Sequence, residues 1–255
     1  MPDVKLAVIK NFSGAAGVYA AHARVQARVA QDLLVFSRPC APAAVLELGC
    51  GTGLYTRLLA EAFPDAALTA VDCSPEMIRA ARAALASPCV AFLRADAEAL
   101  AGGRYDLITA NAAFQWFDDL AGTMERLRGM LGTGGLISFS YFGPRTYREL
   151  QAGLRGATGR RVRLACEDFA SPGEMRGLLA GLYRDCRFET RAYHEDFASL
   201  KDLLAHIKGT GTRGAPGPAD MFWTRGLLRR VEAAYLGLFG RIRATYEVYL
   251  CRGRR

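Results

Sequence analysis

Short apolar runs alternate with longer amphipathic stretches along most of this chain. The apolar runs are typical of strands that are buried on both faces of a parallel sheet. The stretches between them repeat apolar residues at helical spacing. Alternation of this kind indicates an α/β fold with a doubly wound sheet. The pattern predicts strands near residues 44–48, 67–72, 90–94, 105–110 and 135–141, the last after a turn over 132–135, and helices at about 53–63, 75–86 and 119–131.

The region before the first predicted strand has a helical pattern. Apolar residues at helical spacing predict one N-terminal helix from about residue 15 to 36, ended by Pro39 and Pro42. Residues 4–10 are apolar but too short and too interrupted by lysine to predict a signal peptide or a membrane span.

Beyond residue 143 the alternating pattern is interrupted by two mainly helical inserts. The first has breaks at Gly159 and at residues 172–173, and the second contains a turn-rich segment over residues 209–218. Because a core of this kind holds only a cofactor, substrate specificity is expected in the two inserts and in the N-terminal helix. The sequence predicts a single domain over residues 1–255, with a core of 37–143 plus strands near 186–197 and 245–252, and inserts of about 144–184 and 199–240 that form a substrate lid.

A glycine-rich loop follows the first predicted strand. Residues 45–53 read VLELGCGTG, and a helical pattern begins directly afterwards. Glycines in such a loop let the backbone turn tightly and approach a ligand closely. A dinucleotide fingerprint would place its third glycine at position 54, where this chain has Leu54. Glu47 would repel a pyrophosphate and attract an ammonium group, so the loop indicates a cofactor with an amino-acid portion.

The second predicted strand ends in an acid at a useful distance from this loop. Asp72 lies about 20 residues after the last loop glycine, where a carboxylate can accept hydrogen bonds from both ribose hydroxyls. Ser74 and Pro75 then predict a helix start, with Ser74 as N-cap. That start directs Met77 back toward the end of the strand.

Together with residues 92–100 and 105–116, these features resemble the ordered motifs of class I S-adenosylmethionine-dependent methyltransferases. The resemblance implies a seven-stranded Rossmann-like sheet. It also implies S-adenosylmethionine as methyl donor and S-adenosylhomocysteine as product. In that family the acid after the second strand holds ribose, and an aspartate matching Asp96 accepts from the adenine amino group. The implied cofactor-binding residues are Phe12, Tyr19, Glu47, Gly49, Cys50, Gly51, Asp72, Cys73, Met77, Asp96, Ala97, Asn111 and Gln115.

Charge and cysteine content narrow the possible partners and compartment. The formal net charge of +8 suggests an acidic partner, such as an acidic carrier protein. No recognisable RNA-binding module accompanies the charge, so we expect neither a nucleic-acid nor a membrane partner. The seven cysteines are scattered without a Cys-x-x-Cys pair, which predicts neither disulfides nor zinc and fits a cytoplasmic protein. We expect a monomer.

A narrower resemblance covers almost the whole chain. Residues 12–26 are similar to the N-terminal signature of the malonyl-acyl carrier protein O-methyltransferases of biotin synthesis, from which they depart at residues 13–14 and at Ala20. This resemblance implies methyl transfer to the free carboxylate of a malonyl thioester, carried by acyl carrier protein or by coenzyme A. The resulting methyl ester primes pimeloyl synthesis. Further similar segments are residues 111–116, 142–150, 206–212 and 245–249.

The implied reaction demands alignment more than proton transfer. A carboxylate with a pKa near 4 is ionised at neutral pH, so no general base is required, and we expect no catalytic residue beyond positioning groups and no metal. Arg145 follows the fifth predicted strand, and its guanidinium fork suits a carboxylate. The candidate substrate-binding residues are Arg145, Tyr19, Gln115, Trp116, His206 and Lys208.

Other functions fit parts of the same pattern. A methyltransferase of another small carboxylic acid would share the cofactor site and differ in the inserts. A cofactor-binding assembly or modifying protein would keep the fold but act on a protein partner. An RNA-modifying enzyme would use the basic charge, and retention on RNA at physiological salt would support it.

Overall fold

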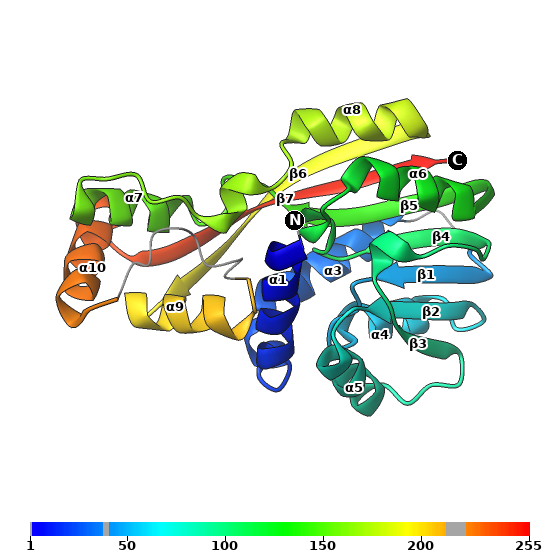
Figure 1. Ribbon diagram of the computed structural model, residues 1–255, viewed down its shortest axis with the longest axis horizontal. Coiled ribbons are helices and arrows are strands. Elements are labelled where there is room, and N and C mark those ends of the chain that lie inside the picture. Colours follow the sequence, from blue (N-terminus) through cyan, green and yellow to red (C-terminus); the bar gives the residue numbers. More distant parts are fainter. Residues whose placement is uncertain (1, 38–40, 213–222) are drawn as a thin grey trace.

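The computed structural model describes residues 2–37, 41–212 and 223–255, with side chains from residue 5 onward (Figure 1). Its sheet has seven strands in the order β3-β2-β1-β4-β5-β7-β6. β7 runs antiparallel to both of its neighbours, and the other pairs are parallel. The predicted seven-stranded α/β fold is therefore confirmed. The strands are β1 (Ala44–Leu48), β2 (Ala67–Asp72), β3 (Val90–Arg94), β4 (Tyr105–Ala110), β5 (Leu131–Phe142), β6 (Arg184–Phe197) and β7 (Ile242–Arg254).

Helices cover both faces of this sheet. Successive strand residues point to opposite faces, so Val45 of β1 packs in one apolar cluster while Leu46 packs in another. The Val45 cluster includes residues of α3 (Arg24–Ser37) and α4 (Leu54–Ala62). The Leu46 cluster includes residues of α6 (Leu120–Met130) and α8 (Pro172–Leu182). Burial on both faces explains why the central strands are almost continuously apolar.

The helix after β2 begins as the sequence predicts. α5 (Pro75–Ala84) has Ser74 as its N-cap, and the Ser74 hydroxyl accepts a hydrogen bond from the Met77 amide at 3.2 Å. Pro75 occupies the first turn, where its missing N–H costs nothing. Two single-turn 3₁₀ segments follow later strands, η1 (Ala97–Ala99) after β3 and η2 (Phe114–Trp116) after β4. Asp72, Asp96 and Trp116 therefore lie at the same edge of the sheet, where the parallel strands β2, β3 and β4 end.

The prediction of one N-terminal helix over residues 15–36 is wrong. Two helices occupy that range, α2 (Tyr19–His22) and α3, and a further helix, α1 (Pro2–Ala15), precedes them. The chain turns between α1 and α2, where the Val18 amide donates to the Ala15 carbonyl at 2.9 Å. A continuous helix would present a single apolar stripe, but α1 and α3 bury theirs against different parts of the molecule. Pro39, predicted to end this helix, lies outside the described residues.

The last two strands form a long antiparallel pair that extends beyond the rest of the sheet (Figure 1). The first predicted insert contains α7 (Arg148–Thr158), η3 (Ala165–Asp168) and α8, and the helix break predicted at Gly159 is confirmed. The second contains α9 (Leu200–Gly209) and α10 (Arg225–Phe239). α7 and α10 pack side by side at the extended end of the β6–β7 pair. Part of the turn-rich segment, residues 213–218, lies outside the described residues.

β5 begins earlier than its sequence suggests. The glycine-rich residues 132–135, predicted as a turn, belong to β5 and lie beside a register shift against β4. Gly134 takes a φ of +73°, which a glycine tolerates inside a distorted strand.

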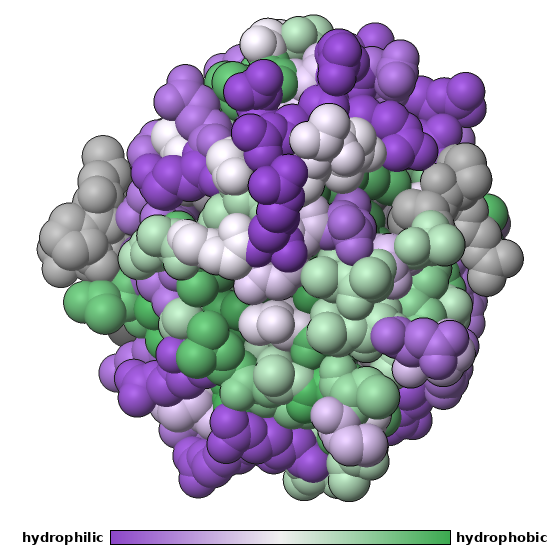
Figure 2. All heavy atoms as spheres, turned by 90° about the vertical axis from the view of Figure 1, so that its right-hand side faces the viewer, coloured by the Kyte–Doolittle hydropathy of each residue, from purple (hydrophilic) through white to green (hydrophobic). Residues whose placement is uncertain are grey.

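The face shown in Figure 2 has many polar side chains at its upper and lower margins and mixed ones between. Among the helices of the described residues, none combines the length and apolar character that crossing a bilayer requires.

Candidate active site

The glycine loop forms one wall of a cavity at the ends of the parallel strands. Gly49, Gly51 and Gly53 have φ values of +70°, +55° and +83°, a region in which other residues are strained. A Cβ at Gly49 would also lie only 2.6 Å from the Cβ of Ala113. The loop therefore requires glycine both for its turn and for its close approach to the segment after β4.

Asp72 holds this loop in place through its carboxylate. Its Oδ2 accepts a hydrogen bond from the Gly51 amide at 2.9 Å, and its Oδ1 accepts one from the Ser74 amide at 2.8 Å. Burial raises the pKa of Asp72, although both backbone hydrogen bonds act in the opposite direction. Each carboxylate oxygen has a second lone pair, so Asp72 can still accept hydrogen bonds from a ligand.

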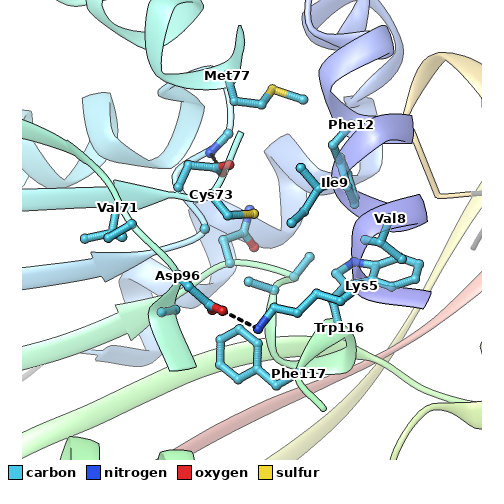
Figure 3. Close-up of a pocket in the computed structure, with 18 of the residues that line it drawn as sticks. Lys5, Val8, Ile9, Phe12, Val71, Cys73, Met77, Asp96, Trp116 and Phe117 are labelled. Atoms are coloured by element: carbon cyan, nitrogen blue, oxygen red, sulfur yellow. Dashed lines mark hydrogen bonds and ion pairs between the residues drawn. The ribbon is translucent and has the colours of Figure 1, made fainter. Parts of the chain in front are cut away.

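The cavity beside Asp72 contains about 770 Å³ of empty space, part of it open to solvent. Figure 3 shows that its walls come from α1, the ends of β2 and β3, and the segment after β4. Most of the residues predicted to bind the cofactor are brought together here. Those that line the cavity are Phe12, Tyr19, Gly49, Gly51, Asp72, Cys73, Met77, Asp96, Ala97 and Asn111.

Three predicted cofactor residues lie near this cavity but do not line it. Glu47 is 1% exposed, and its Oε2 has no hydrogen-bond partner among the described residues. Cys50 is buried within the loop. Gln115 joins two strand ends, because its Nε2 donates to the Ala112 carbonyl at 2.8 Å and its Oε1 accepts from the Phe142 amide at 3.4 Å. The positions of Cys50 and Gln115 suit indirect roles in shaping the cavity.

α1 closes one side of the cavity; of its cavity-lining residues only Phe12 was predicted from the sequence, and the contributions of Lys5, Val8 and Ile9 were not. Val8 and Ile9 line the cavity, and Lys5 reaches across it to Asp96, with 2.6 Å between Nζ and Oδ2 (Figure 3). Lys5 also pairs with Glu98. Lys5, Val8, Ile9 and Phe12 recur at helical spacing, so this signal was present in the sequence.

An aromatic cluster closes the end of the cavity near Phe12. The Phe12 ring lies edge-on to Trp116 with centroids 5.7 Å apart, and Tyr19 lies 6.4 Å from Phe12. Trp116 also contacts Phe169, which follows η3. The Trp116 Nε1 donor is buried and has no partner among the described residues. Tyr19 and Trp116, both predicted to contact substrate, are thus placed together on the cavity wall.

Arg145 is not brought into this cavity. It lies in a separate surface hollow beside Arg148 and Arg161, with its side chain 69% exposed. Its Nε is 4.0 Å from a carboxylate oxygen of Glu247, and its backbone amide donates to the other oxygen at 3.1 Å. The backbone of Arg145 is therefore fixed while its guanidinium is only loosely held.

His206 and Lys208 also lie outside the cavity, in different surroundings. His206 is 2% exposed, and burial lowers its pKa to about 4, so the ring is neutral at pH 7. Its Nε2 shares a hydrogen bond of 2.8 Å with the Tyr246 hydroxyl, in which the donor depends on the histidine tautomer. His206 therefore cannot supply a positive charge to a substrate. Lys208 is exposed and lines another hollow, between α1 and α9.

Known proteins share both the sequence and this arrangement. The methyltransferase domain family matches residues 45–135. A malonyl-[acyl-carrier protein] O-methyltransferase from Acetivibrio thermocellus is 32% identical over 265 residues, covering 96% of this chain and 92% of its own length. The chain belongs to the malonyl-[acyl-carrier protein] O-methyltransferase family. Its enzyme class is S-adenosylmethionine-dependent O-methyltransferase.

Solved structures share the fold of this family member. The YcgJ protein of Bacillus subtilis has a TM-score of 0.62 at 15% identity and covers 89% of this chain and 98% of its own. The plantazolicin methyltransferase BpumL, in complex with S-adenosylhomocysteine, has a TM-score of 0.50 at 17% identity and covers 97% of this chain and 89% of its own. At identities this low, the two structures support the fold of this chain and say nothing about its substrate.

The cavity has the donors and acceptors that S-adenosylmethionine needs. Asp72 and Asp96 present carboxylates where ribose hydroxyls and an adenine amino group would need acceptors. The buried Oε2 of Glu47, which has no partner among the described residues, suits a cationic ammonium, and a Cβ at Gly51 would stand in open space beside the cavity. We therefore propose that these residues hold the cofactor, with Lys5 and Ile9 closing the cavity above it.

Glu47 gives a testable pH dependence. Burial raises its pKa to about 8, so the carboxyl is mostly protonated at pH 7 in the free protein. A bound ammonium group favours the carboxylate, and binding then releases a proton. We expect the affinity for S-adenosylhomocysteine to rise with pH, by at most about tenfold per pH unit below the pKa of Glu47, and to level off above it. Calorimetry from about pH 6 to 8.5 measures this slope.

The matched control for this prediction is Glu47→Gln, which keeps the shape of the side chain and removes its titration. The variant should bind more weakly at pH 8 and lose most of the pH slope. Parallel slopes in the parent protein and in Glu47→Gln would assign the slope to another group and contradict a role for Glu47 beside the ammonium.

Proposed function

We propose that this protein transfers the methyl group of S-adenosylmethionine to the free carboxylate of malonyl-[acyl-carrier protein]. The observation that carries the proposal is the sequence similarity to malonyl-[acyl-carrier protein] O-methyltransferases. At 32% identity to the relative from Acetivibrio thermocellus, it extends over nearly the whole chain and includes both inserts. A cavity with carboxylates at one end and an aromatic cluster at the other supports it. The product would be the methyl ester that primes pimeloyl synthesis for biotin.

The residues of the site would act by binding and alignment. When bound, S-adenosylmethionine supplies an electrophilic methyl group on a sulfonium. The malonyl carboxylate is already ionised at neutral pH, so the protein has no proton to remove before the oxygen attacks. Holding reactants in line is worth up to about 7–11 kcal/mol in favourable cases. Phe12, Tyr19 and Trp116 would exclude water at the reacting end of the cavity.

The two inserts would form the substrate lid. The first places Phe169 against Trp116, and the second places Gly211, just after α9, where a Cβ would lie 2.9 Å from the Phe12 ring. Both inserts therefore touch the aromatic cluster rather than the adenine end. This contact supports a division in which the core binds the cofactor and the inserts select the acyl group.

One assay with labelled S-adenosylmethionine tests the proposal. The acceptors are malonyl-carrier protein, malonyl-coenzyme A, free malonate and an aconitate-type acid, with acetyl-carrier protein as the control that lacks a free carboxylate. We expect label on malonyl-carrier protein as a base-labile methyl ester and none on acetyl-carrier protein. Preferential labelling of a free acid would instead support a methyltransferase of small carboxylic acids.

A further inference from the structure

A second hollow lies on the other side of α1 from the cofactor cavity. It contains about 840 Å³ of empty space and is open to solvent. Residues of α1, α2 and α9 enclose it, so the helix that covers the cofactor cavity also forms a wall of this hollow. The lining residues are Lys10, Asn11, Gly14, Ala15, Val18, His22, Ala205, Lys208 and Gly209.

The charge of this hollow is positive. Lys10 and Lys208 reach it from α1 and α9, and no acid is among its described lining residues. Both lysines are exposed, and neither forms an ion pair with the described residues, whereas Lys5 on the same helix as Lys10 is bound to Asp96 and Glu98. Since the chain has few lysines, two in one acid-free hollow form a local site for an anion.

The base of the hollow is formed by close packing between α2 and α9. A Cβ at Gly209 would lie 2.4 Å from the His22 ring, so glycine is needed there for α9 to approach α2 closely. His22 in turn lies edge-on to the buried His206, with ring centroids 5.7 Å apart. These contacts fix the end of α9, and with it the backbone of Lys208, against the N-terminal helices.

The hollow and the cofactor cavity meet at the end of α1. Lys10 and Asn11 face the hollow, while Ile9 and Phe12 face the cavity, as expected for neighbouring positions on a helix. Phe12 also contacts Gly211, only two residues beyond the Gly209 floor of the hollow. An extended ligand with one end beside the lysines would therefore reach the aromatic cluster by parting the contact between Gly211 and Phe12.

We propose that this hollow binds the phosphate of a 4′-phosphopantetheine arm through Lys10 and Lys208, while the malonyl end of the arm reaches Phe12 and Trp116. The inference rests on the proposed function, because it takes a malonyl thioester as substrate. Acyl carrier protein and coenzyme A carry the same arm and the same phosphate, so the site would serve both. The ammonium groups act as point charges on the phosphate oxygens, a role that lysine fills well.

The test compares two small substrates that differ only in the phosphate. They are S-malonyl-4′-phosphopantetheine and S-malonyl-pantetheine, assayed with the parent protein and with the Lys10→Ala/Lys208→Ala double variant. We expect kcat/KM for the phosphorylated thioester to fall about 10- to 100-fold in the variant, mainly through KM. For the thioester without phosphate it should change less than about twofold. S-adenosylhomocysteine affinity should be unchanged.

Lys201→Ala is the matched control, because Lys201 is an exposed lysine of the same α9 that does not line the hollow. It should leave both substrates unaffected. Malonyl-carrier protein and malonyl-coenzyme A should each lose efficiency in the double variant. A loss with malonyl-carrier protein alone would mean that the lysines contact the carrier surface, and the inference would be overturned.

Two further outcomes separate this inference from the proposed function. Equal losses for the phosphorylated and unphosphorylated thioesters, or no loss for either, would overturn the phosphate site while leaving the proposed function intact. A parent protein that methylates none of the malonyl thioesters would overturn the proposed function and this inference with it.

Discussion

Asp72→Ala should weaken the binding of S-adenosylhomocysteine by about 5- to 150-fold, corresponding to about 1–3 kcal/mol. The change removes the proposed acceptor of both ribose hydroxyls. It also leaves the amides of Gly51 and Ser74 without the carboxylate that now accepts their hydrogen bonds at 2.9 and 2.8 Å. The glycine loop would lose its connection to the end of β2 as well as a contact with the ligand. Calorimetry measures the loss of affinity directly.

Asp72→Asn and Asp65→Ala complete this experiment. The asparagine side chain would retain one carbonyl oxygen, which cannot serve both backbone amides and the ribose from two sides as the carboxylate does, so we expect a loss close to that of alanine. Asp65 is an exposed acid just before β2, and its replacement should leave affinity unchanged. Unchanged affinity in Asp72→Ala would refute the placement of the cofactor between the glycine loop and β2.

The same variants test how burial affects the free protein. Because burial raises the pKa of Asp72 in the folded state, ionisation of this carboxyl opposes folding at pH values above its unfolded pKa. Lowering the pH through the raised pKa therefore removes an unfavourable term in the parent protein. The buried Asp72 carboxylate therefore lowers the free energy of unfolding to some extent, while it holds the glycine loop and would bind the ligand.

The parallel strands were predictable because their pattern has a single explanation. A run such as residues 44–48, apolar at every position except Glu47 and followed by glycines, fits a central strand and little else. Asp72 and Asp96 follow such strands, and parallel strands end at the same edge, so their meeting in one cavity follows from topology. The Ser74 cap was predictable for the same reason, since its chemistry is local.

α1 was not predictable with the same method. Its residues 5, 8, 9 and 12 have helical spacing, but an isolated helix of this length is marginal and the segment gives no sign of what its apolar face covers. The ion pair between Lys5 and Asp96 joins residues that are far apart in sequence. Charge on a lysine reveals no partner at that distance, so the contact of Lys5 across the cavity was visible only in the structure, whereas Phe12 at the other end of α1 was predicted to bind the cofactor.

Arg145 shows a different limit. Its place after β5 correctly predicts that its backbone lies at the cofactor edge of the sheet, where the Gly143 and Arg145 amides bond to Glu247 of β7. The direction of a long exposed side chain is not set by topology, and here it points into the hollow with Arg148 and Arg161. Binding of a malonyl carboxylate by Arg145 therefore requires its guanidinium to leave Glu247, 4.0 Å away, and turn toward the aromatic cluster.

Arg145→Ala should reduce kcat/KM for malonyl thioesters by about 10- to 100-fold or more, because a hydrogen bond to a charged group is worth about 1.5–3 kcal/mol. Arg145→Lys keeps the charge but loses the planar fork, so its activity should lie between alanine and the parent protein. The loosely held pair with Glu247 offers little resistance to the turn, since an ion pair this exposed contributes at most about 1 kcal/mol. Steady-state kinetics on malonyl-carrier protein measures both variants.

The control is Arg160→Ala, which removes another exposed arginine of the first insert that does not line the hollow. It should retain near-normal efficiency. S-adenosylhomocysteine affinity should stay unchanged in all three variants, because the pairing is with substrate alone. If Arg145→Ala keeps its efficiency, or loses cofactor binding in proportion to activity, the carboxylate is held elsewhere. The Nε1 donor of Trp116, which is buried in the cavity wall without a partner in the described part of the chain, is then the next group to test.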